Sequence, residues 1–445
     1  MSDNFNYDVL YLGSGHGAFN GAIPLASKGY QLGVIELGLI GGTCPNRGCN
    51  AKISLAMIPT TQHNVQELQG SGLNGVPTID WKANVEHKDE VIAPLPDAIA
   101  KMMTKAGIDL IHGKGKLVDA HTLKVANKLY TADKIVIATG AHYRKLDIPG
   151  SELTNDGTDL LNLKTKPKRM TVIGSGYIAL EFANIAASAG TKVTVLMHHK
   201  VALRKFYQPF VKNLLEQLTN LGVKFVSDVE PQRIEKDGDN LVVKTNKGDF
   251  KADWILNATG RPANVTGIGL NKVGVKYNRN GIQVNDHLQT SVPSIYATGD
   301  VIDKKVGKLT PTAIFESEYL TSLFSGENDQ AINYPAVPSA VFTTPRIAQV
   351  GVSVDEAELK PDEYTIKEIN LANDWYRMTK NENKGISKII YDKKGLVVGA
   401  TEISDQAEDA ISTILPAIEF QLTPKQIKHM ISLFPTIGSE TWSKM

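Results

Sequence analysis

The chain has 445 residues, more than one hydrophobic core usually holds, so we expect roughly two to four domains. Its 42% hydrophobic content and formal charge of +1 are those of an ordinary globular protein, and no basic run indicates nucleic-acid binding. Because no apolar stretch reaches membrane-spanning length and the N-terminus has no secretory signal, we expect a cytoplasmic protein that contacts neither nucleic acid nor a membrane.

The first predicted unit is a strand, a glycine turn, a helix and a second strand. A strand over residues 7–12 leads into Gly13-Ser14-Gly15-His16-Gly17-Ala18, and a helix through Ser27 precedes a strand that ends at Glu36. The two spaced glycines let the backbone turn tightly and approach a pyrophosphate, which then lies at the helix N-terminus, while Ala18 allows close packing. Glu36, twenty-one residues after Gly15, is placed to hold a pair of ribose hydroxyls.

The only two cysteines follow this strand, in Gly41-Gly42-Thr43-Cys44-Pro45-Asn46-Arg47-Gly48-Cys49. Two thiols that close on one helix turn can form and break a disulfide with little backbone movement, as a two-electron relay requires. Buried structural cysteines are the alternative, and a structural zinc site is disfavoured because it needs four Cys or His ligands. The neighbouring dinucleotide motif favours a redox pair, which in a reducing cytosol indicates catalysis.

The same pattern recurs later in the chain. A strand over 169–173 is followed by Gly174-Ser175-Gly176-Tyr177-Ile178-Ala179, a helix through Ala189 and a strand over 192–196. One glycine motif is weak evidence, but two copies in the same strand-turn-helix-strand setting are strong. The chain is therefore predicted to bind two dinucleotides.

The two copies differ where dinucleotides are distinguished. The position that matches Glu36 is Met197, and a cationic cluster follows it, made of His198, His199, Lys200 and Arg204. A cluster of cations without a carboxylate suits the extra phosphate of NADP through charge-assisted hydrogen bonds. A solvated polar loop is the alternative interpretation. NADPH is the predicted second nucleotide.

Three further strands end in glycine, as backbones that pass close to a cofactor often do. They cover residues 135–140, with Thr139 and Gly140, residues 255–260, with Gly260, and residues 294–300. The third ends in Asp300, whose carboxylate can hold sugar or ribityl hydroxyls.

Together these motifs resemble the pyridine nucleotide-disulfide oxidoreductases of the glutathione reductase and dihydrolipoamide dehydrogenase type. The resemblance covers nearly the whole chain and includes the cysteine segment, 176–181, 297–300, 309–311, 337–343 and Pro435-Thr436. It implies an α/β fold with two Rossmann-like dinucleotide-binding domains and a C-terminal α+β dimerisation domain. The implied boundaries are an FAD domain over 1–149, an NADP domain over 150–277, a segment over 278–333 that completes the FAD domain, and a dimerisation domain over 334–445 of a homodimer.

The resemblance also implies roles for single residues. Hydride would pass from the nicotinamide to the flavin and then to the disulfide, with Cys49 against the flavin and Cys44 exchanging with the substrate. The residues expected at FAD are Gly13, Ser14, Gly15, Ala18, Glu36, Thr43, Lys52, Gly115, Thr139, Gly140, Asp300, Thr312 and Ala313, with Glu181 beside the flavin. Those expected at NADP are Gly174, Gly176, Tyr177, Ile178, His198, His199, Arg204 and Gly260. No metal ligands are expected.

Two regions of the chain depart from the family pattern, one near the C-terminus and one near the cysteines. Phe434 stands where the family has the His of His-Pro-Thr, which the partner subunit supplies as acid–base for thiol exchange, and a phenyl ring cannot replace it. Ser439 stands where the family has Glu, and Glu440 follows one position later. We name Glu440 as the candidate catalytic carboxylate, with His429 as the weaker alternative. Near the cysteines, Ile53 occupies the usual Lys position and Lys52 comes one residue earlier.

Three functions remain open at this point. The first is NADPH-dependent reduction of a small disulfide through FAD and the cysteine pair, with an unusual proton donor. The second is electron transfer to an acceptor that needs no thiol protonation, such as a metal ion, a quinone or oxygen. The third is a flavin redox sensor with little turnover. An intact cysteine pair beside two nucleotide motifs argues against the third, because unused thiols are an oxidation liability.

Overall fold

The structure is a computed structural model in which residues 5–445 are described. The chain divides into two compact units. The first unit comprises the chain up to Ser54 together with Glu86–Arg144 and Arg261–Tyr334, and the second comprises Leu55–Val85, Lys145–Gly260 and Pro335–Met445. No helix within residues 5–445 is long and apolar enough to cross a membrane.

The first unit is built on a parallel sheet in the order β3-β2-β1-β6, with β16 on the other side of β6. The strands β1 and β2 consist largely of buried apolar residues, as expected of parallel strands covered on both faces. The first residues of β6 turn away from β1 and form an antiparallel ribbon with β5 and β4. The strands are β1 (Tyr7–Leu12), β2 (Leu32–Glu36), β3 (Asp109–His112), β4 (Gly115–Leu117), β5 (Thr122–Val125), β6 (Lys128–Ile137) and β16 (Ile295–Ala297).

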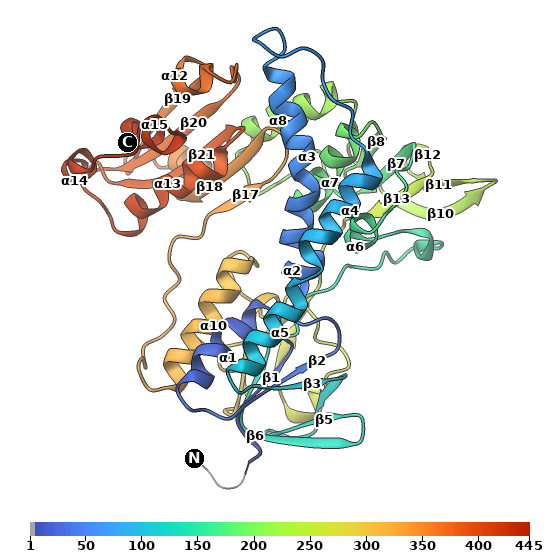
Figure 1. Cartoon of the computed structure of the whole chain (residues 1–445), viewed down its shortest axis with the longest axis vertical. Coiled ribbons are helices and arrows are strands. Elements are labelled where there is room, and N and C mark those ends of the chain that lie inside the picture. The colour runs from blue at the N-terminus through green and yellow to red at the C-terminus, as the bar shows by residue number, and fades with distance from the viewer. Residues whose placement is uncertain (1–4) are drawn as a thin grey trace. The chain divides into compact units, whose positions relative to one another are not determined.

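Two helices of this unit, α1 (His16–Ser27) and α10 (Thr310–Phe324), lie side by side (Figure 1). They touch at Gly21, where an added Cβ would lie 2.2 Å from the backbone oxygen of Ser317. The hydroxyl of Thr321 donates a hydrogen bond to the Gly21 carbonyl at 2.8 Å. The glycine therefore lets α10 approach α1 closely. The N-terminus of α10 and the first glycine turn belong to the same unit. The other helices here include α2 (Thr43–Arg47) and α5 (Leu95–Lys105).

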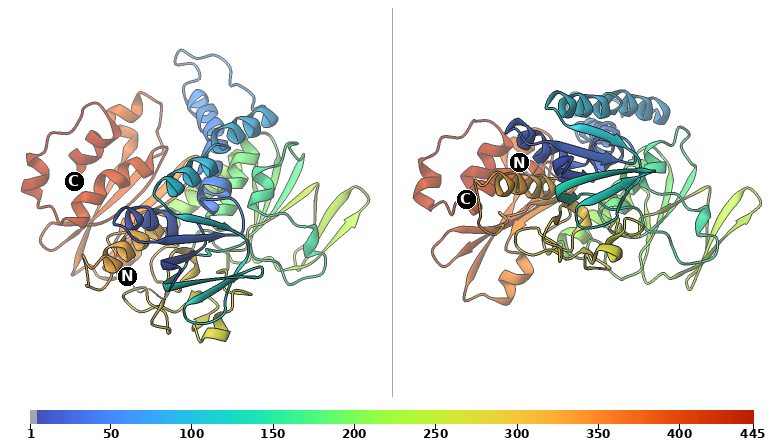
Figure 2. Two further views of the ribbon diagram at one scale, coloured as in Figure 1. Left: turned by 60° about the horizontal axis from the view of Figure 1, so that its bottom comes forward. Right: turned by 90° about the horizontal axis from the view of Figure 1, so that it is seen from below.

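The second unit contains another parallel sheet, in the order β13-β7-β8-β9. A separate antiparallel sheet of three strands, β10-β11-β12, extends from this region (Figure 2). The elements are β7 (Arg169–Ile173), α7 (Tyr177–Ser188), β8 (Lys192–Leu196), α8 (Gln208–Asn220), β9 (Lys224–Val226), β10 (Pro231–Asp237), β11 (Asn240–Thr245), β12 (Gly248–Ala252) and β13 (Trp254–Asn257).

The C-terminal part of the second unit is an antiparallel sheet in the order β17-β18-β21-β20-β19. Helix α13 packs on it with alanines and isoleucines spaced three and four residues apart, the pattern of a helix with one apolar face. The elements are β17 (Ser339–Val341), β18 (Arg346–Gly351), α11 (Val354–Leu359), β19 (Tyr364–Asn370), α12 (Trp375–Met378), β20 (Ile386–Asp392), β21 (Val397–Ser404), α13 (Ala407–Glu419), α14 (Pro424–His429) and α15 (Ile437–Lys444).

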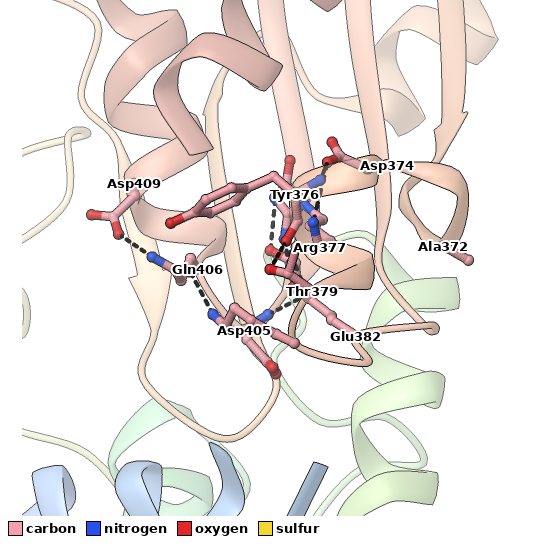
Figure 3. Close-up of polar contacts among 12 residues, drawn as sticks. Ala372, Asp374, Tyr376, Arg377, Thr379, Glu382, Asp405, Gln406 and Asp409 are labelled. Carbon is pink, nitrogen blue, oxygen red and sulfur yellow. Dashed lines mark hydrogen bonds and ion pairs between the residues drawn. The ribbon is translucent and has the colours of Figure 1, made fainter. Parts of the chain in front are cut away.

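A buried ionic network ties α12 to this sheet (Figure 3). The Arg377 guanidinium is 1% exposed, and it donates to both carboxylate oxygens of Glu382 at 3.0 Å and to Glu402 at 2.6 Å. The Asp405 N–H donates to Glu382 at 2.8 Å, so the loop after β21 joins the same network. The buried cation is thus paired with two carboxylates, as buried charges generally are.

Helix α3 (Cys49–Glu67) begins in the first unit and ends in the second. Its last turns belong to the second unit, where His63 Nε2 lies 3.3 Å from Asp405 Oδ1. The side-chain amide of Asn381 donates to the Glu67 carbonyl at 2.8 Å. The end of the helix that starts with Cys49 therefore contacts the loop after α12 and the loop after β21.

The predicted architecture is confirmed. Both Rossmann-like sheets and the C-terminal α+β sheet are present, and the strands predicted over 7–12, 169–173 and 192–196 have these bounds. The second glycine-turn helix ends at Ser188, one residue before the predicted end.

Candidate functional site

The first glycine turn connects β1 to α1. Gly13 has φ of +109°, and an added Cβ would lie 2.4 Å from the Ala138 oxygen, so only glycine fits between the two strand ends. Gly15 is the N-cap of α1, and no side chain in residues 5–445 caps the N-terminus of that helix. Uncapped N–H groups at a helix N-terminus are the donors that bind a pyrophosphate.

Glu36 ends β2 beside this turn. Its carboxylate accepts hydrogen bonds from the Ser14 N–H at 2.9 Å, the Ser14 hydroxyl at 2.7 Å and the Gly38 N–H at 2.7 Å. These bonds fix its direction, and a carboxylate has acceptor sites left for ribose hydroxyls. The predicted FAD residues Gly13, Ser14, Gly15, Ala18 and Glu36 therefore gather at one end of β1 and β2 and fit a dinucleotide.

The segment that carries the cysteines rests on the same turn. The Gly41 N–H donates to the Ser14 hydroxyl at 3.1 Å, and an added Cβ on Gly42 would lie 2.8 Å from the Gly15 Cα. Thr43 follows as the first residue of α2. The segment that leads into Cys44 is thus packed directly against the glycine turn.

Cys44 and Cys49 lie on two successive helices and not on one helical turn. Cys44 is in α2, and Cys49 begins α3 after a break at Gly48, whose φ of −132° and ψ of −121° are not helical. An added Cβ on Gly48 would lie 2.9 Å from the Thr43 oxygen and 3.0 Å from the Cys44 Cα. The prediction of a single turn was wrong in this respect, because the glycine breaks the helix while keeping the two cysteines close.

Both cysteines are free thiols, Cys44 half-buried and Cys49 exposed. The thiol of Cys49 donates a hydrogen bond to Cys44, and this bond lowers the pKa of Cys44 to about 6 although burial opposes it. The same bond raises the pKa of Cys49. The pair therefore loses its first proton readily, from Cys44, and holds the second.

Two residues beside the thiols were missed by sequence reasoning. The Thr310 hydroxyl, in the first turn of α10, lies 3.5 Å from the Cys49 sulfur, and its hydrogen bonding also lowers the pKa of Cys44. The Asn50 amide oxygen lies 3.4 Å from the Cys44 sulfur. Lys52 adds a positive charge that lowers the pKa of Cys49, although the hydrogen bond to Cys44 outweighs it. Thr310 belongs to one of the family motifs, but only the fold brings it to the cysteines.

Further predicted FAD residues lie in the first unit. Thr139 and Gly140 follow β6, where the Thr139 hydroxyl donates to the Asn264 carbonyl at 2.9 Å. Asp300 is half-buried, with an Arg261 nitrogen 3.5 Å from its carboxylate. Thr312 and Ala313 are buried in the first turn of α10, and Gly115 is buried where an added Cβ would meet Leu12 at 2.5 Å.

The second glycine turn connects β7 to α7. Gly174 has φ of +123°, and Gly176 is the N-cap of a helix that no side chain in the described part of the chain caps. An added Cβ on Gly176 would meet no described atom within 4 Å, so the space in front of the helix is open. Tyr177 and Ile178 form the first turn of α7, and Gly260 follows β13 with φ of +128°.

The predicted NADP cluster lies next to this second turn. His198, His199 and Arg204 are exposed after the end of β8, and the two imidazole rings stand edge to face. The Leu203 N–H donates to the Ser175 carbonyl at 3.0 Å, which ties the loop of Arg204 to the glycine turn. The structure therefore brings the predicted cations to the predicted pyrophosphate site.

Glu181 is buried in α7, 4% exposed. One of its carboxylate oxygens accepts the Phe342 N–H at 2.8 Å, which links α7 to the end of β17. Both residues lie in segments that resemble the family, 176–181 and 337–343.

The C-terminal candidates lie around α15. Phe434 is 66% exposed before a cis Phe434-Pro435 bond, and Ser439 is buried in a capping box with Thr436. Glu440 is half-buried in the first turn of α15. Thr436 thus caps the helix that carries Glu440, and Ser439 completes the capping box.

The chain matches two protein-family models. Residues 7–317 match the pyridine nucleotide-disulphide oxidoreductase family, and residues 337–445 match the dimerisation domain of that family. The chain belongs to the pyridine nucleotide-disulphide oxidoreductases. It is thus an FAD-dependent NAD(P)H oxidoreductase, as the sequence predicts.

Individual relatives span the whole chain. A glutathione reductase from Nostoc sp. is 31% identical and covers 98% of each chain. A mercuric reductase from Bacillus cereus is 29% identical over 98% of this chain and 70% of its own. The HOCl-induced flavoprotein disulfide reductase RclA from Escherichia coli has a similar solved structure, with 25% identity, a TM-score of 0.89 and 99% of each chain covered. Its Cu(II) complex is also similar, with 25% identity, a TM-score of 0.88, and 97% of this chain and 98% of that chain covered.

Proposed function

We propose that the protein transfers electrons from NADPH, through FAD and the Cys44–Cys49 pair, to a small disulfide in the cytoplasm. The observation that supports this most is the thiol pair itself. Its pKa at Cys44 is lowered to about 6, so the reduced pair holds a thiolate at neutral pH. A thiolate is the nucleophile of disulfide exchange, and a pKa below ambient pH makes it the major form.

FAD, when bound, supplies the two-electron transfer between the nicotinamide and the cysteine pair. The Cys44 thiolate then attacks one sulfur of the substrate, the substrate S–S bond breaks, and the first substrate thiol leaves with a proton. Cys49 attacks the Cys44 sulfur of the mixed disulfide, which releases the second thiol and restores the Cys44–Cys49 disulfide. In sum, one NADPH and one proton are consumed and two thiols form for each disulfide reduced.

The proton for the leaving thiol needs a donor, and we assign this role to Glu440. Phe434 holds no proton, whereas Glu440 is half-buried at the start of α15, on the segment that follows it. A partly buried carboxyl group can act as a general acid. Glu440→Gln is expected to slow disulfide turnover without changing the amount of bound FAD.

NADPH is the proposed nucleotide because of the cluster beside the second glycine turn. His198, His199 and Arg204 are exposed there, and the backbone bond from Leu203 to Ser175 holds the loop near the turn. Arg is well suited to bind a phosphate group through paired hydrogen bonds. Met197, after β8, occupies the position that Glu36 has at the end of β2, so the second glycine motif has no carboxylate at that position.

A homodimer is proposed through the dimerisation domain. Residues near its C-terminus expose large apolar side chains to an extent that isolated surface residues do not explain. These are Phe420, Met430, Ile431, Leu433 and Phe434. Light scattering that shows an active monomer would contradict this proposal.

A second candidate function is reduction of a metal ion or a quinone. One support is Phe434, whose phenyl ring cannot protonate a leaving thiol. The other is RclA, whose Cu(II) complex is structurally similar to this chain. Such acceptors need no thiol protonation. The two functions are separated by anaerobic NADPH consumption against glutathione disulfide, other small disulfides, a soluble quinone and Cu(II). Fast turnover with quinone or Cu(II) and none with any disulfide would replace the first candidate by the second.

A further inference from the structure

A buried carboxylate on α10, Glu316, lies behind the turn that carries Asp300. Glu316 is 0% exposed. Its oxygen Oε1 accepts hydrogen bonds from Lys304 Nζ at 2.5 Å and from the Tyr334 hydroxyl at 2.8 Å, and Oε2 accepts the Gly299 N–H at 2.6 Å. The Lys304 side chain is only 5% exposed, so cation and carboxylate are buried together. Burial raises the pKa of Glu316, which Lys304 and Gly299 oppose.

The turn over Thr298–Asp300 is held from three directions. The Thr298 hydroxyl donates to the Gly17 carbonyl of α1 at 2.6 Å. The Gly299 N–H is bound by Glu316, and Lys308 Nζ donates to the Asp300 carbonyl at 2.9 Å. Of these three anchors, Glu316 is the only one that also reaches a buried cation, and it lies on α10 one turn after Thr312 and Ala313.

We infer that Glu316 is a positioning residue for the FAD site. Lys304 and Tyr334 hold its carboxylate, and the carboxylate holds the Gly299 N–H, which fixes the turn that carries Asp300. This inference rests on FAD binding by the family and on the role proposed for Asp300, not on the identity of the electron acceptor. Its physical basis is that an N–H bound to a charged acceptor in a buried site is directionally fixed, and loss of such an acceptor leaves the N–H unsatisfied. The Asp300 backbone would then lose its fixed position next to α1.

Two double variants separate positioning from simple burial of an ion pair. Glu316→Gln with Lys304→Met removes both charges but keeps an oxygen acceptor for Gly299. Glu316→Leu with Lys304→Met removes both charges and the acceptor, while the site stays filled with apolar atoms. Replacement of a buried ion pair by apolar groups is often tolerated, so both proteins are expected to fold.

The measurement is the dissociation constant of FAD, from fluorescence during titration of the apoprotein, with the visible flavin spectrum as a second readout. We expect the Gln/Met variant to bind FAD within about 3-fold of wild type and the Leu/Met variant to bind about 10-fold or more weakly, as loss of a hydrogen bond to a charged group predicts. The exposed pair Glu356 and Lys360, replaced in the same way, is the control, and its FAD affinity should not change.

Equal FAD affinity in the two double variants would overturn the inference, even if both lose thermal stability. Should the Leu/Met protein not fold, Tyr334→Phe gives the second arm. This variant removes one donor to Glu316 and leaves the ion pair, and we expect FAD binding several-fold weaker with a shifted flavin spectrum. An unchanged dissociation constant and spectrum in Tyr334→Phe would then count against the inference.

Discussion

The ring of Phe434 stacks on the indole of Trp375, with centroids 5.9 Å apart and planes 23° from parallel. Both side chains are more than half exposed, at 66% and 56%. The residue at the family's acid–base position is therefore a surface aromatic group supported by a second aromatic group, and not part of the hydrophobic core. A polar ring can replace it without leaving a cavity.

Phe434→His is accordingly expected to fold and to raise disulfide turnover. A positioned general acid–base group typically contributes about 10²–10⁴-fold, so we expect at least about a 10-fold rise in kcat with the best small disulfide. The NADPH-reduced protein can also show a long-wavelength charge-transfer band, which requires a Cys49 thiolate near the flavin. This band should be weak in wild type at neutral pH because Cys49 keeps its proton. It should be stronger in Phe434→His.

The matched control is Leu359→His, which places the same ring at an exposed position at the end of α11, outside the proposed dimer surface. Turnover and the band should stay at wild-type values in this control. If Phe434→His changes neither the turnover nor the band, the missing histidine is not what limits disulfide reduction.

The pKa of Cys44 can be measured from its alkylation rate. In the reduced protein we expect the rate of reaction with iodoacetamide at Cys44, followed by mass spectrometry, to be half-maximal near pH 6. Cys49→Ala removes the hydrogen bond that lowers this pKa most, so the midpoint should move up toward about 8.5, the value of an ordinary thiol. Thr310→Val should move it upward by less. A midpoint that stays in place in Cys49→Ala would contradict the assigned cause.

The His63–Asp405 pair predicts a pH-dependent stability. Burial lowers the pKa of His63, but the hydrogen bond and charge of Asp405, with Glu67 and Glu382, outweigh burial and raise it above 6.5. A raised pKa contributes stability that is complete below pH 6.5 and is lost as the pH rises through the folded-state value. The lowered pKa of Asp405 contributes stability that is lost only on acidification below 3.8.

Calorimetric melting temperatures of wild type and His63→Gln, compared between pH 5.5 and 8.5, check this prediction. The difference between the two proteins should be largest at the acidic end and shrink toward pH 8.5. Exposed His87, replaced by Gln, is the control and should give no such trend. A difference that is constant over the range would show that the pair is not ionised as proposed.

Arg204→Ala is expected to weaken the use of NADPH and to spare that of NADH. Loss of one charge-assisted contact to phosphate costs about 1.5–3 kcal/mol, or about 10- to 150-fold in kcat/KM. Steady-state kinetics with both nucleotides give the ratio, and Lys212→Ala, which removes an exposed cation from α8, should leave it unchanged. Equal use of NADPH and NADH by wild type would refute the assignment of the cluster.

The local parts of the fold were predictable from the sequence. The glycine turns, their flanking strands and Glu36 were identified because spacing along the chain fixes them, and Gly13 and Gly174 adopt the positive φ angles that only glycine tolerates easily. The break at Gly48 was not predicted, since a glycine inside a short helical segment does not by itself show where the helix ends.

The remaining parts of the site depend on contacts between distant residues. Thr310 meets Cys49 across 261 positions, and Glu316 binds the turn at Gly299 through the packing of α10 on α1. No local pattern marks Glu316 or His63 as special, because their partners are chosen by the fold. The sequence therefore predicted the family and the residues expected to carry its chemistry, and the structure adds contacts around them that spacing along the chain does not reveal.

The measurement that tests the proposed function most directly is anaerobic NADPH consumption by Cys44→Ser and Cys49→Ser, each retaining FAD, with a small disulfide and with a soluble quinone. We expect wild type to reduce the disulfide and each variant to lose this activity by at least about 10³-fold, the scale of losing an essential catalytic group. Quinone reduction should survive in both variants. Disulfide reduction that continues at the wild-type rate in either variant would contradict the claim that electrons leave the protein through the cysteine pair.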